Sequence, residues 1–366
     1  GTRSMKFAAV VWIAVLASMN VSAGEVPWLA EVTSPPADVP SPDPPLSRSP
    51  ASTDLESWQD HRLQLREQWL AVLGPLPQPP ESMELATISE ERLEHCTRSL
   101  VRYEAEPGRF VEAYLLKPLA TQEATKEAKH PAVVVFHPTT SDTIGVVAGT
   151  AGRPEQHLGL DLAKHGFVTL CPRNFLWEEK NYDDAVAAAK RRHPGSLGMA
   201  TMLADGMRAV DLLAAMPDVD ADRIGAIGHS LGAKEVLYLM AFDERVQVGV
   251  VSEGGIGLTF TNWDAPWYLG DVIHSKDFAR DHHELLALAS PRPLLILAGE
   301  SGAGAADGDR TWPYVVAAQQ AYRLYGEPVR LGLLNHREGH RLDGAAREKA
   351  LQWIEVALME EVRNEK

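Results

Sequence analysis

The sequence predicts an α/β protein with a mostly parallel central sheet and helices on both faces. Two observations favour this class. Strands and helices alternate repeatedly from about residue 91 onward, with short connections between them. The predicted strand 132–136 is purely apolar and lies between Pro131 and Pro138, which is typical of a parallel strand buried on both faces.

The other elements follow from local patterns. An early pair of strands is joined by the turn Glu106-Pro107-Gly108, and the later strands are short apolar runs. The helices show apolar residues at helical spacing. We expect strands at 100–104, 110–116, 167–171, 224–227, 246–251, 294–297 and 329–334, and helices at 55–73, 158–165, 199–216, 231–242 and 345–362.

The first 23 residues have the pattern of a secretory signal peptide. After the tag-like residues 1–4, Met5 begins a basic stretch, an apolar run covers 7–17, and small residues precede a cleavage site after Ala23. The apolar run is shorter than the roughly 20 residues that a transmembrane helix needs. We expect export from a bacterial cell, to the periplasm or the extracellular space, without stable membrane insertion. An uncleaved anchor is the alternative.

The rest of the chain divides into three parts. Residues 24–54 are rich in proline and serine, which disfavours helices and central strands, and we expect a linker or arm. Residues 55–90 are expected to form an N-terminal helical appendage, and residues 91–366 the α/β domain. The sequence does not specify an oligomeric state.

Charge and cysteine content limit the possible partners. The formal net charge is −15 and the isoelectric point is about 5.3. Because a strongly acidic surface repels phosphate backbones, a nucleic-acid partner is not expected. Cys96 and Cys171 lie far apart and lack metal-ligand spacing, so they indicate either two buried thiols or one disulfide, and no metal site.

The run Gly228-His229-Ser230-Leu231-Gly232 predicts a serine nucleophile. A G-x-S-x-G match alone is weak, because glycine and serine are common. Here the predicted strand 224–227 leads into the run and the predicted helix 231–242 leaves it, which is the strand-turn-helix setting that exposes the serine. An ordinary turn with an incidental serine is the structural alternative.

A serine nucleophile needs a histidine base, which should come late in the chain. His340 follows a glycine on the loop before the last predicted helix, where a base can reach back over the serine. His336, closer to the preceding strand, is expected to make a structural hydrogen bond instead.

The acid that orients this histidine is sought after the predicted strand 294–297. Asp309 stands four residues before Pro313, a common spacing for such an acid, and Asp307 is close enough to compete. Glu300 is the third candidate and is more readily a structural carboxylate. The acid would hold the histidine tautomer and stabilise the imidazolium.

Two backbone N–H groups are needed to stabilise an oxyanion. One is expected from Leu231, which opens the helix after the nucleophile and adds the helix dipole. The second should come from the loop after strand 132–136. Pro138 has no N–H, so the donor is expected to be Thr139, with Thr140 as the alternative, while His137 braces the loop.

Three segments together resemble bacterial α/β-hydrolases of the dienelactone hydrolase and acetyl xylan esterase-like kind. They are the stretch from Asp222 through Ser230 to Ser252-Glu253-Gly254-Gly255, the stretch from His282 to Pro293, and the stretch from Asn335 to His340. The resemblance covers roughly residues 101–357 and implies the α/β-hydrolase fold.

The resemblance also implies the chemistry. Dienelactone hydrolases proper use cysteine where this chain has Ser230, so a carboxylic-ester hydrolase with an acyl-enzyme intermediate is implied, without metal or organic cofactor. Glucuronoyl esterases are similar in Lys234 but carry arginine where this chain has Leu231, which argues against glucuronoyl ester specificity. Acylated carbohydrates or small esters are the expected substrates.

Substrate-binding candidates come from two segments. The aromatic residues Trp263 and Trp267 follow a strand and could stack on a sugar ring, or form a packed aromatic loop. The insertion 174–197 ends in the basic run 190–193, which could attract an acidic substrate or form a solvated helix end. Lys234 is a further candidate, although a helix lysine more often forms a local contact.

Two other functions are compatible with these motifs. A serine peptidase of the prolyl oligopeptidase type shares the fold and the order of the triad, but the residues before the sheet are too few for the β-propeller of such enzymes. An inactive hydrolase acting as a binding scaffold would need a broken triad, and every part of the triad is present in the sequence.

Overall fold

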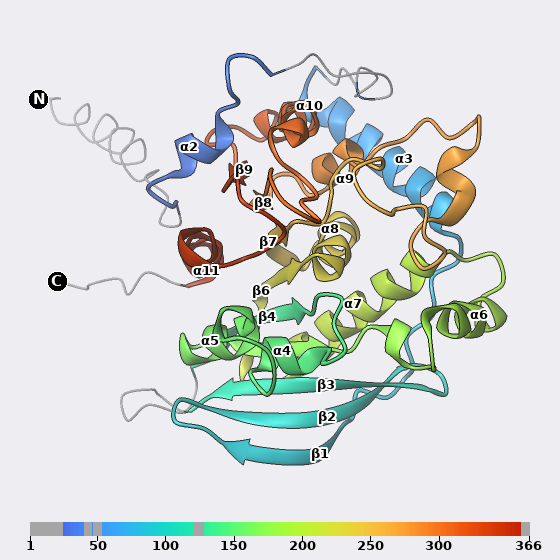
Figure 1. Ribbon diagram of the computed structural model, residues 1–366, viewed down its shortest axis with the longest axis vertical. Helices are drawn as coiled ribbons and strands as arrows, with labels where there is room; N and C mark the ends of the chain where they lie inside the picture. Colours follow the sequence, from blue (N-terminus) through green and yellow to red (C-terminus); the bar gives the residue numbers. More distant parts are fainter. Residues whose placement is uncertain (1–24, 40–45, 47–52, 120–127, 360–366) are drawn as a thin grey trace, which may run out of the picture.

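The computed structural model describes residues 25–39, 46, 53–119 and 128–359 (Figure 1). Within these residues, the strands form one nine-stranded sheet with the order β1-β2-β3-β5-β4-β6-β7-β8-β9. Strands β4 to β9 are parallel to one another, and the antiparallel strands β1 to β3 extend the sheet through the β3–β5 pair. The predicted fold class, a mostly parallel α/β sheet, is confirmed.

The strands of the parallel region are buried over most of their length, apart from the exposed start of β6. The strands are β1 (Leu85–Arg92), β2 (Cys96–Glu106), β3 (Arg109–Pro118), β4 (His130–Phe136), β5 (Val168–Pro172), β6 (Val219–His229), β7 (Val246–Ser252), β8 (Leu294–Ala298) and β9 (Leu331–Asn335).

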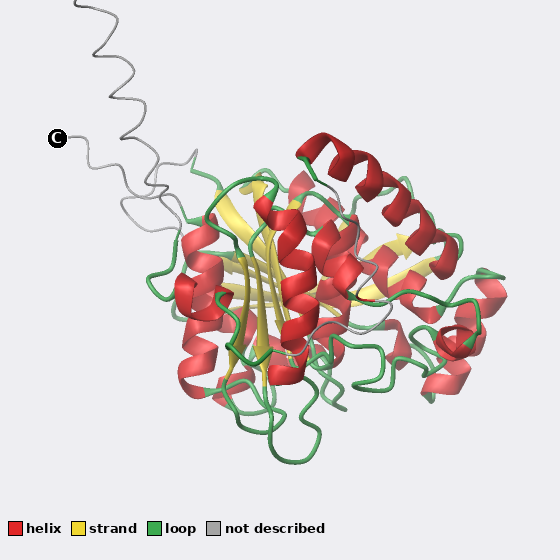
Figure 2. Cartoon of the chain, turned by 90° about the horizontal axis from the view of Figure 1, so that it is seen from above, coloured by secondary structure: helices red, strands yellow, loops and turns green. Residues whose placement is uncertain are grey.

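Helices cover both faces of the sheet (Figure 2). On one face lie α3 (Leu55–Leu73), α6 (Tyr182–Arg192), α7 (Gly198–Ala215), α8 (Leu231–Phe242), α9 (His283–Leu288) and α10 (Trp312–Arg323). On the other lie α2 (Leu29–Thr33), α4 (Ile144–Ala148), α5 (Leu158–Lys164) and α11 (Gly344–Leu358).

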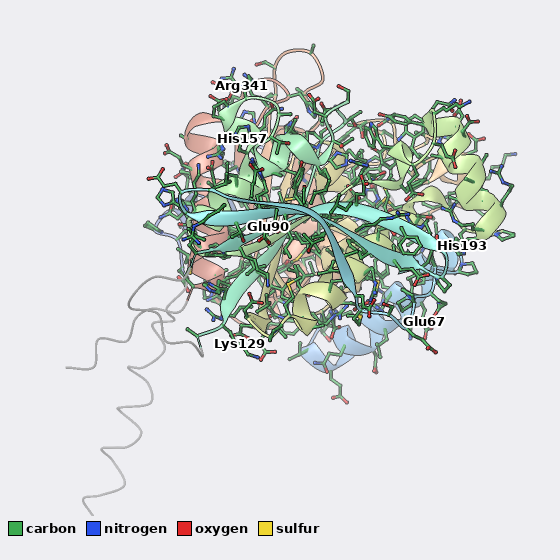
Figure 3. All side chains as sticks on the ribbon, turned by 90° about the horizontal axis from the view of Figure 1, so that it is seen from below. Glu67, Glu90, Lys129, His157, His193 and Arg341 are labelled. Carbon is green, nitrogen blue, oxygen red and sulfur yellow. The ribbon has the colours of Figure 1, made fainter. Side chains whose placement is uncertain are left out.

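The boundaries of the N-terminal parts differ from the sequence prediction. Strand β1 lies in the region assigned to a helical appendage, so the sheet begins before residue 91. Only Leu85 of β1 is shielded, and the other residues are exposed at the edge of the sheet, where Figure 3 shows Glu90. An exposed strand carries no apolar alternation, which explains why it was missed. Helix α3 begins and ends where it was predicted.

Part of the proline-rich arm is attached to the domain. Trp28 Nε1 donates to Gln352 Oε1 at 2.7 Å, and the Trp28 ring lies 5.8 Å from that of Trp353 on α11. Val32 of α2 is buried.

The predicted signal peptide, residues 1–23, lies outside the described residues. No described helix is both long and apolar enough to span a bilayer. Cys96 and Cys171 are buried and unpaired.

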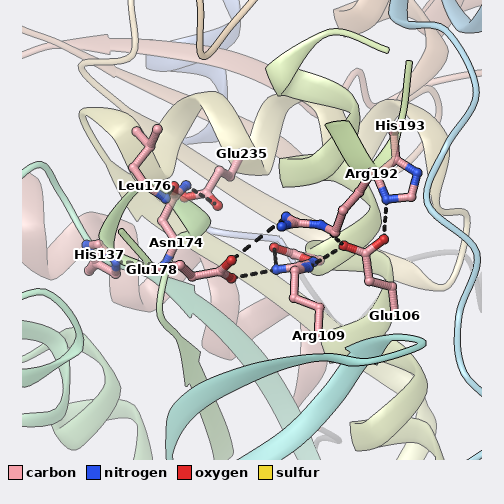
Figure 4. Close-up of polar contacts among 10 residues, drawn as sticks. Glu106, Arg109, His137, Asn174, Leu176, Glu178, Arg192, His193 and Glu235 are labelled. Carbon is pink, nitrogen blue, oxygen red and sulfur yellow. Dashed lines mark hydrogen bonds and ion pairs between the residues drawn. The ribbon is translucent and has the colours of Figure 1, made fainter. Parts of the chain in front are cut away.

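A buried network of charges joins the β2–β3 hairpin to the helices (Figure 4). Arg109, which is 6% exposed, donates to Glu106 at the end of β2 and to Asp205 on α7. Its Nη1 also donates to Glu178 Oε1 at 2.7 Å. Burial raises the pKa of Asp205 and of Glu178, and Arg109 opposes both shifts. One guanidinium therefore balances three carboxylates that have little access to water.

The basic run at the end of α6 belongs to the same network. Arg192 Nε donates to Glu106 Oε1 at 3.1 Å, and the His193 ring contacts the other oxygen of this carboxylate. Burial alone raises the pKa of Glu106, but Arg109 and His193 outweigh it and hold the pKa below its usual value. Half of the run thus fastens the insertion 174–197 to the hairpin, which favours a structural role over attraction of an acidic substrate.

Substituting Arg109 with methionine is expected to lower the free energy of unfolding by about 3–5 kcal/mol, because it leaves buried carboxylates without their cation. Arg102→Met is the control, since Arg102 is exposed and only covers the ring of Phe110. Urea unfolding followed by tryptophan fluorescence measures both variants. Equal losses in the two would contradict a special role for Arg109.

Candidate active site

Ser230 occupies a sharp turn between β6 and α8. Its backbone has φ 58° and ψ −117°, a conformation that costs a non-glycine residue about 1–3 kcal/mol. The two flanking glycines make the turn possible. A Cβ on Gly228 would lie 2.3 Å from a backbone carbon of Gly232, and a Cβ on Gly232 would lie 2.5 Å from the carbonyl oxygen of Phe136. Both glycines of the G-x-S-x-G run therefore have a steric reason.

Neighbouring strands hold this turn in place. Strand β6 lies between β4 and β7 in the middle of the sheet. The Ser230 N–H donates to the carbonyl of Ser252, the last residue of β7, at 2.8 Å. Ser230 thus stands at the carboxyl edge of the sheet, directly before the N-terminus of α8.

His340 lies beside this turn. It is on the loop between β9 and α11, and its ring centroid is 4.7 Å from that of His229, which precedes the nucleophile candidate. His229 Nδ1 is hydrogen-bonded to Ser252 Oγ at 2.9 Å. Burial lowers the pKa of His229 to about 3, and the nearby His340 adds to the shift. His229 is therefore neutral at physiological pH.

The carboxylate that contacts His340 is Glu253. Its Oε2 lies 3.3 Å from His340 Nδ1 and also accepts a hydrogen bond from the N–H of Ala306 at 2.6 Å. Its Oε1 accepts from the N–H of Gly299. The Glu253 side chain is fully buried, and these donors satisfy both of its oxygens. This arrangement holds an imidazole through Nδ1 and leaves Nε2 for proton transfer.

This geometry corrects the expected position of the acid. Asp307 is buried and accepts from the N–H groups of Gly255 and Ile256 and from the Thr311 hydroxyl, so it binds backbone instead of His340. Burial raises its pKa, and these hydrogen bonds oppose the shift.

Asp309 is also engaged elsewhere. It accepts from Asn335 Nδ2 at 2.9 Å and from Arg337 at 3.2 Å, with a side chain that is 40% exposed. Glu300, the third candidate, accepts from the other end of Arg337. The loop after β8 therefore turns its carboxylates away from His340 and presents backbone N–H groups to Glu253.

Sequence reasoning missed Glu253 because it placed the acid after β8. Glu253 follows β7 immediately, in the run Ser252-Glu253-Gly254-Gly255. A carboxylate that directly follows a buried apolar strand is a signal that could have found it. Glu253 also has a φ of 55°, which is unusual for a non-glycine residue, but this feature is visible only in the structure.

The oxyanion candidates Leu231 and Thr139 lie on the two segments expected. Leu231 is the first residue of α8, so its N–H has no partner within the helix. Thr139 is exposed on the loop after β4. No hydrogen bond recorded among the described residues uses either N–H.

His137 braces the loop after β4. Its Nδ1–H donates to the Pro138 carbonyl at 2.8 Å, and its Nε2 accepts from the Asn174 N–H at 3.1 Å. Burial lowers the pKa of His137 to about 4, so the ring is neutral and can both donate and accept. Asn174 Nδ2 in turn donates to Glu235 on α8 (Figure 4), which links this loop to the nucleophile helix.

Two of the three substrate-binding candidates are covered by protein. Trp263 is 0% exposed and donates through Nε1 to the Gly255 carbonyl, so it cannot stack on a ligand. Lys234 is 4% exposed, with Nζ 3.7 Å from the centroid of the Trp263 ring. Both residues brace the segment after Glu253, which is the packed-loop alternative.

Trp267 remains accessible in part. It belongs to a row of aromatic rings that leads from His137, on the loop after β4, to the segment after β7. Within this row, Trp177, Tyr182 and Trp267 are half-buried. The successive centroid distances are 5.0 Å from His137 to Trp177, 5.2 Å from Trp177 to Tyr182 and 5.4 Å from Tyr182 to Trp267.

A small cavity is lined in part by His229 and His340. Its volume is about 90 Å³, and its walls combine apolar side chains with Glu155, Gln156 and two arginines. The lining includes Phe136, Pro138, Val147, Arg153, Leu158, His229, His340, Arg341 and Leu342. Among the described residues, no group of three or more histidine, cysteine or acidic side chains is placed to hold a metal ion.

Part of the chain matches a known protein family. Residues 113–261, which span β3 to the segment after β7, match the profile of the dienelactone hydrolase family. YtaP of Bacillus subtilis (strain 168), which is named as a hydrolase, is 25% identical over 249 residues, covering 65% of this chain and 80% of YtaP.

Solved structures extend the likeness to most of the chain. A glucuronoyl esterase from Solibacter usitatus superposes with a TM-score of 0.66 at 18% identity, covering 88% of this chain and 99% of its own. The protein has the α/β-hydrolase fold. It is also similar to a family 15 glucuronoyl esterase from Teredinibacter turnerae (TM-score 0.60, 18% identity, 93% and 97% covered) and to an acetyl xylan esterase from Paenibacillus sp. R4 (0.54, 16%, 87% and 97%).

Gly228→Ala is expected to destabilise the fold by about 1–3 kcal/mol or more, because the added methyl group overlaps backbone that cannot move aside. Gly206→Ala on α7 is the matched control, since its methyl group would meet only side-chain carbons at 3.3 Å or more. Thermal unfolding followed by circular dichroism compares them. A Gly228→Ala variant as stable as Gly206→Ala would contradict the tight elbow.

Proposed function

We propose that the protein is an exported serine carboxylic-ester hydrolase with the triad Ser230, His340 and Glu253. The contact between His340 and Glu253 beside the strained Ser230 turn carries this proposal. It combines a presented hydroxyl, an imidazole and an acid that holds the imidazole. The dienelactone hydrolase profile and the esterase neighbours support the same reaction class.

In the proposed mechanism, Ser230 Oγ attacks the ester carbonyl while His340 Nε2 takes its proton. The N–H groups of Leu231 and Thr139 stabilise the negative charge on the carbonyl oxygen. His340 then gives the proton to the departing alcohol oxygen as the C–O bond breaks, which leaves an acyl-serine. A water molecule, deprotonated by His340, attacks this ester and releases the carboxylic acid, and Ser230 regains its proton.

The proposed substrates are acylated carbohydrates or small esters. The row of half-buried rings Trp177, Tyr182 and Trp267 offers apolar faces of the kind on which sugars stack. The small cavity beside His340 suits a short group better than a long acyl chain, since sites for drug-sized ligands are roughly 300–1,000 Å³. Export is proposed from the sequence pattern of residues 1–23 alone.

Hydrolysis of p-nitrophenyl acetate tests the reaction class. We expect the wild type to be active and Ser230→Ala to lose activity by several orders of magnitude. Folded Ser230→Ala protein that keeps wild-type turnover would contradict the serine mechanism, and a wild type inactive on every ester tried would contradict the function.

The assignment of the acid has its own test. Glu253→Gln should lower kcat by about 10³- to 10⁴-fold, because the amide favours the wrong tautomer of His340. Asp309→Asn, which changes a carboxylate on the loop after β8, should keep kcat within about threefold. Steady-state kinetics on one ester compares kcat of the two variants. A larger loss of kcat in Asp309→Asn would support an acid on the loop after β8 instead.

The stacking surface is tested with two substrates. Trp267→Ala should raise KM about 10-fold for an acetylated xylo-oligosaccharide, because it removes a ring face worth roughly 1–2 kcal/mol. KM for p-nitrophenyl acetate should change little, since that ester has no sugar to stack. Equal effects on both substrates would place the sugar elsewhere. A parallel panel of uronate methyl esters ranks the ester classes.

A further inference from the structure

We propose that Lys234 and Asp307 are positioning residues that clamp the peptide group between Gly254 and Gly255 and so hold Glu253 against His340. The proposal rests on the proposed function, because it assigns Glu253 the role of the acid. It gives a new role to two residues that the sequence suggested for substrate binding and for the acid itself.

The clamp acts on one peptide group from both sides. The carbonyl of Gly254 accepts a hydrogen bond from Lys234 Nζ at 2.7 Å. The N–H of Gly255, on the same peptide group, donates to Asp307 Oδ2 at 2.9 Å, and the next N–H, of Ile256, donates to Oδ1 at 2.7 Å. Hydrogen bonds to charged groups are roughly twice as strong as neutral ones, so this peptide plane is held firmly between a cation and an anion.

The turn that carries Glu253 needs such restraint. Glu253 has φ 55° and Gly255 has φ 75°, so two of three successive residues are left-handed. A strained backbone persists only where its surroundings over-determine it. Before Glu253 the chain is fixed by the β-sheet, and the Glu253 N–H donates to the Leu297 carbonyl at 2.9 Å. After Glu253, the clamp supplies the restraint.

Lys234 is built into the protein instead of facing a ligand. It is 4% exposed, lies over the rings of Trp263 at 3.7 Å and Tyr268 at 4.9 Å, and donates a second hydrogen bond to Thr261 Oγ1 at 2.6 Å. Its two hydrogen bonds within the described part of the chain thus go to a carbonyl and a hydroxyl, and neither goes to a carboxylate. A buried ammonium group is costly unless it is compensated, and here its partners are a carbonyl, a hydroxyl and two aromatic faces.

Two effects shift the pKa of Lys234 in opposite directions. Burial lowers its pKa to about 7, and the negative charge of Asp307 raises it. The nearby His282 is kept neutral by burial, which lowers its pKa to about 3. Asp307 is therefore the group that favours the charged lysine, and removing either member of the clamp weakens the other.

Lys234 also connects the acid to the nucleophile. It is four residues after Ser230 on α8, and its N–H donates to the Ser230 carbonyl at 3.3 Å. Residues four apart lie on the same helix face. One side chain therefore ties the helix that follows Ser230 to the turn that carries Glu253, so that the two ends of the triad keep a fixed relation.

The test uses the full-length chain and four variants. Lys234→Met and Asp307→Asn break the clamp with nearly conserved volume. Lys349→Met and Asp281→Asn are the matched controls, because Lys349 also covers a tryptophan ring, at 5.2 Å, and Asp281 also accepts from buried backbone N–H groups. If Lys234→Met does not fold, Lys234→Gln replaces it, since an amide can donate to Gly254 without a charge.

We expect each clamp variant to lower kcat about 10- to 100-fold with little change in KM, because a misplaced acid impairs proton transfer and not binding. In a Glu253→Gln background, the same substitutions should have almost no further effect on kcat. A purely structural role would lower kcat by the same factor in both backgrounds, and that result would overturn the proposal.

A second readout does not depend on activity. The Nδ1 proton of His340 should give a downfield NMR signal in histidine-labelled wild type that disappears in Glu253→Gln. Lys234→Met and Asp307→Asn should shift or broaden this signal, while the controls keep it. An unchanged signal in both clamp variants would overturn the proposal. An inactive wild type whose signal still depends on the clamp would contradict the proposed function alone.

Discussion

A buried carboxylate must find hydrogen-bond donors, and around Glu253 this requirement arranges the whole carboxyl edge of the sheet. Glu253 lies at the end of β7, and its donors come from the end of β8, from the loop beyond it and from His340 after β9. The carboxyl ends of three adjacent parallel strands, or the loops that follow them, therefore meet at one side chain. Because an unpaired buried charge is very costly, this convergence also fixes where the imidazole stands relative to the Ser230 turn.

The same physical requirement operates at the opposite end of the site. Arg109 gathers the carboxylates of Glu106, Glu178 and Asp205, and so holds the insertion that carries Trp177 and Tyr182. At the start of that insertion, the N–H of Asn174 donates to His137, which lies on the loop after β4. The loops around the serine are therefore fixed by buried polar groups on both sides, while apolar packing shapes the layers beneath them.

Local features of the chain were predictable from the sequence, and contacts between distant segments were not. The helix 231–242 and the turn before it were predicted because the glycines, the serine and the apolar periodicity are neighbours in the chain. The contact between Glu253 and His340 was not predicted because several carboxylates compete, and only the path of the loop after β8 decides which one meets His340. The burial of Trp263 was not predictable for the same reason. The sequence around an aromatic residue in a loop does not indicate whether its ring is buried or exposed.

The loop after β8 supports Glu253 through the main-chain groups of Gly299 and Ala306. Side chains therefore matter to this support only at Asp307 and at glycines such as Gly299, where a Cβ would lie 2.5 Å from the Glu338 carbonyl oxygen. The other positions of the loop can change during evolution while Glu253 keeps its donors. Sequence change in this segment would then leave the contact between Glu253 and His340 in place.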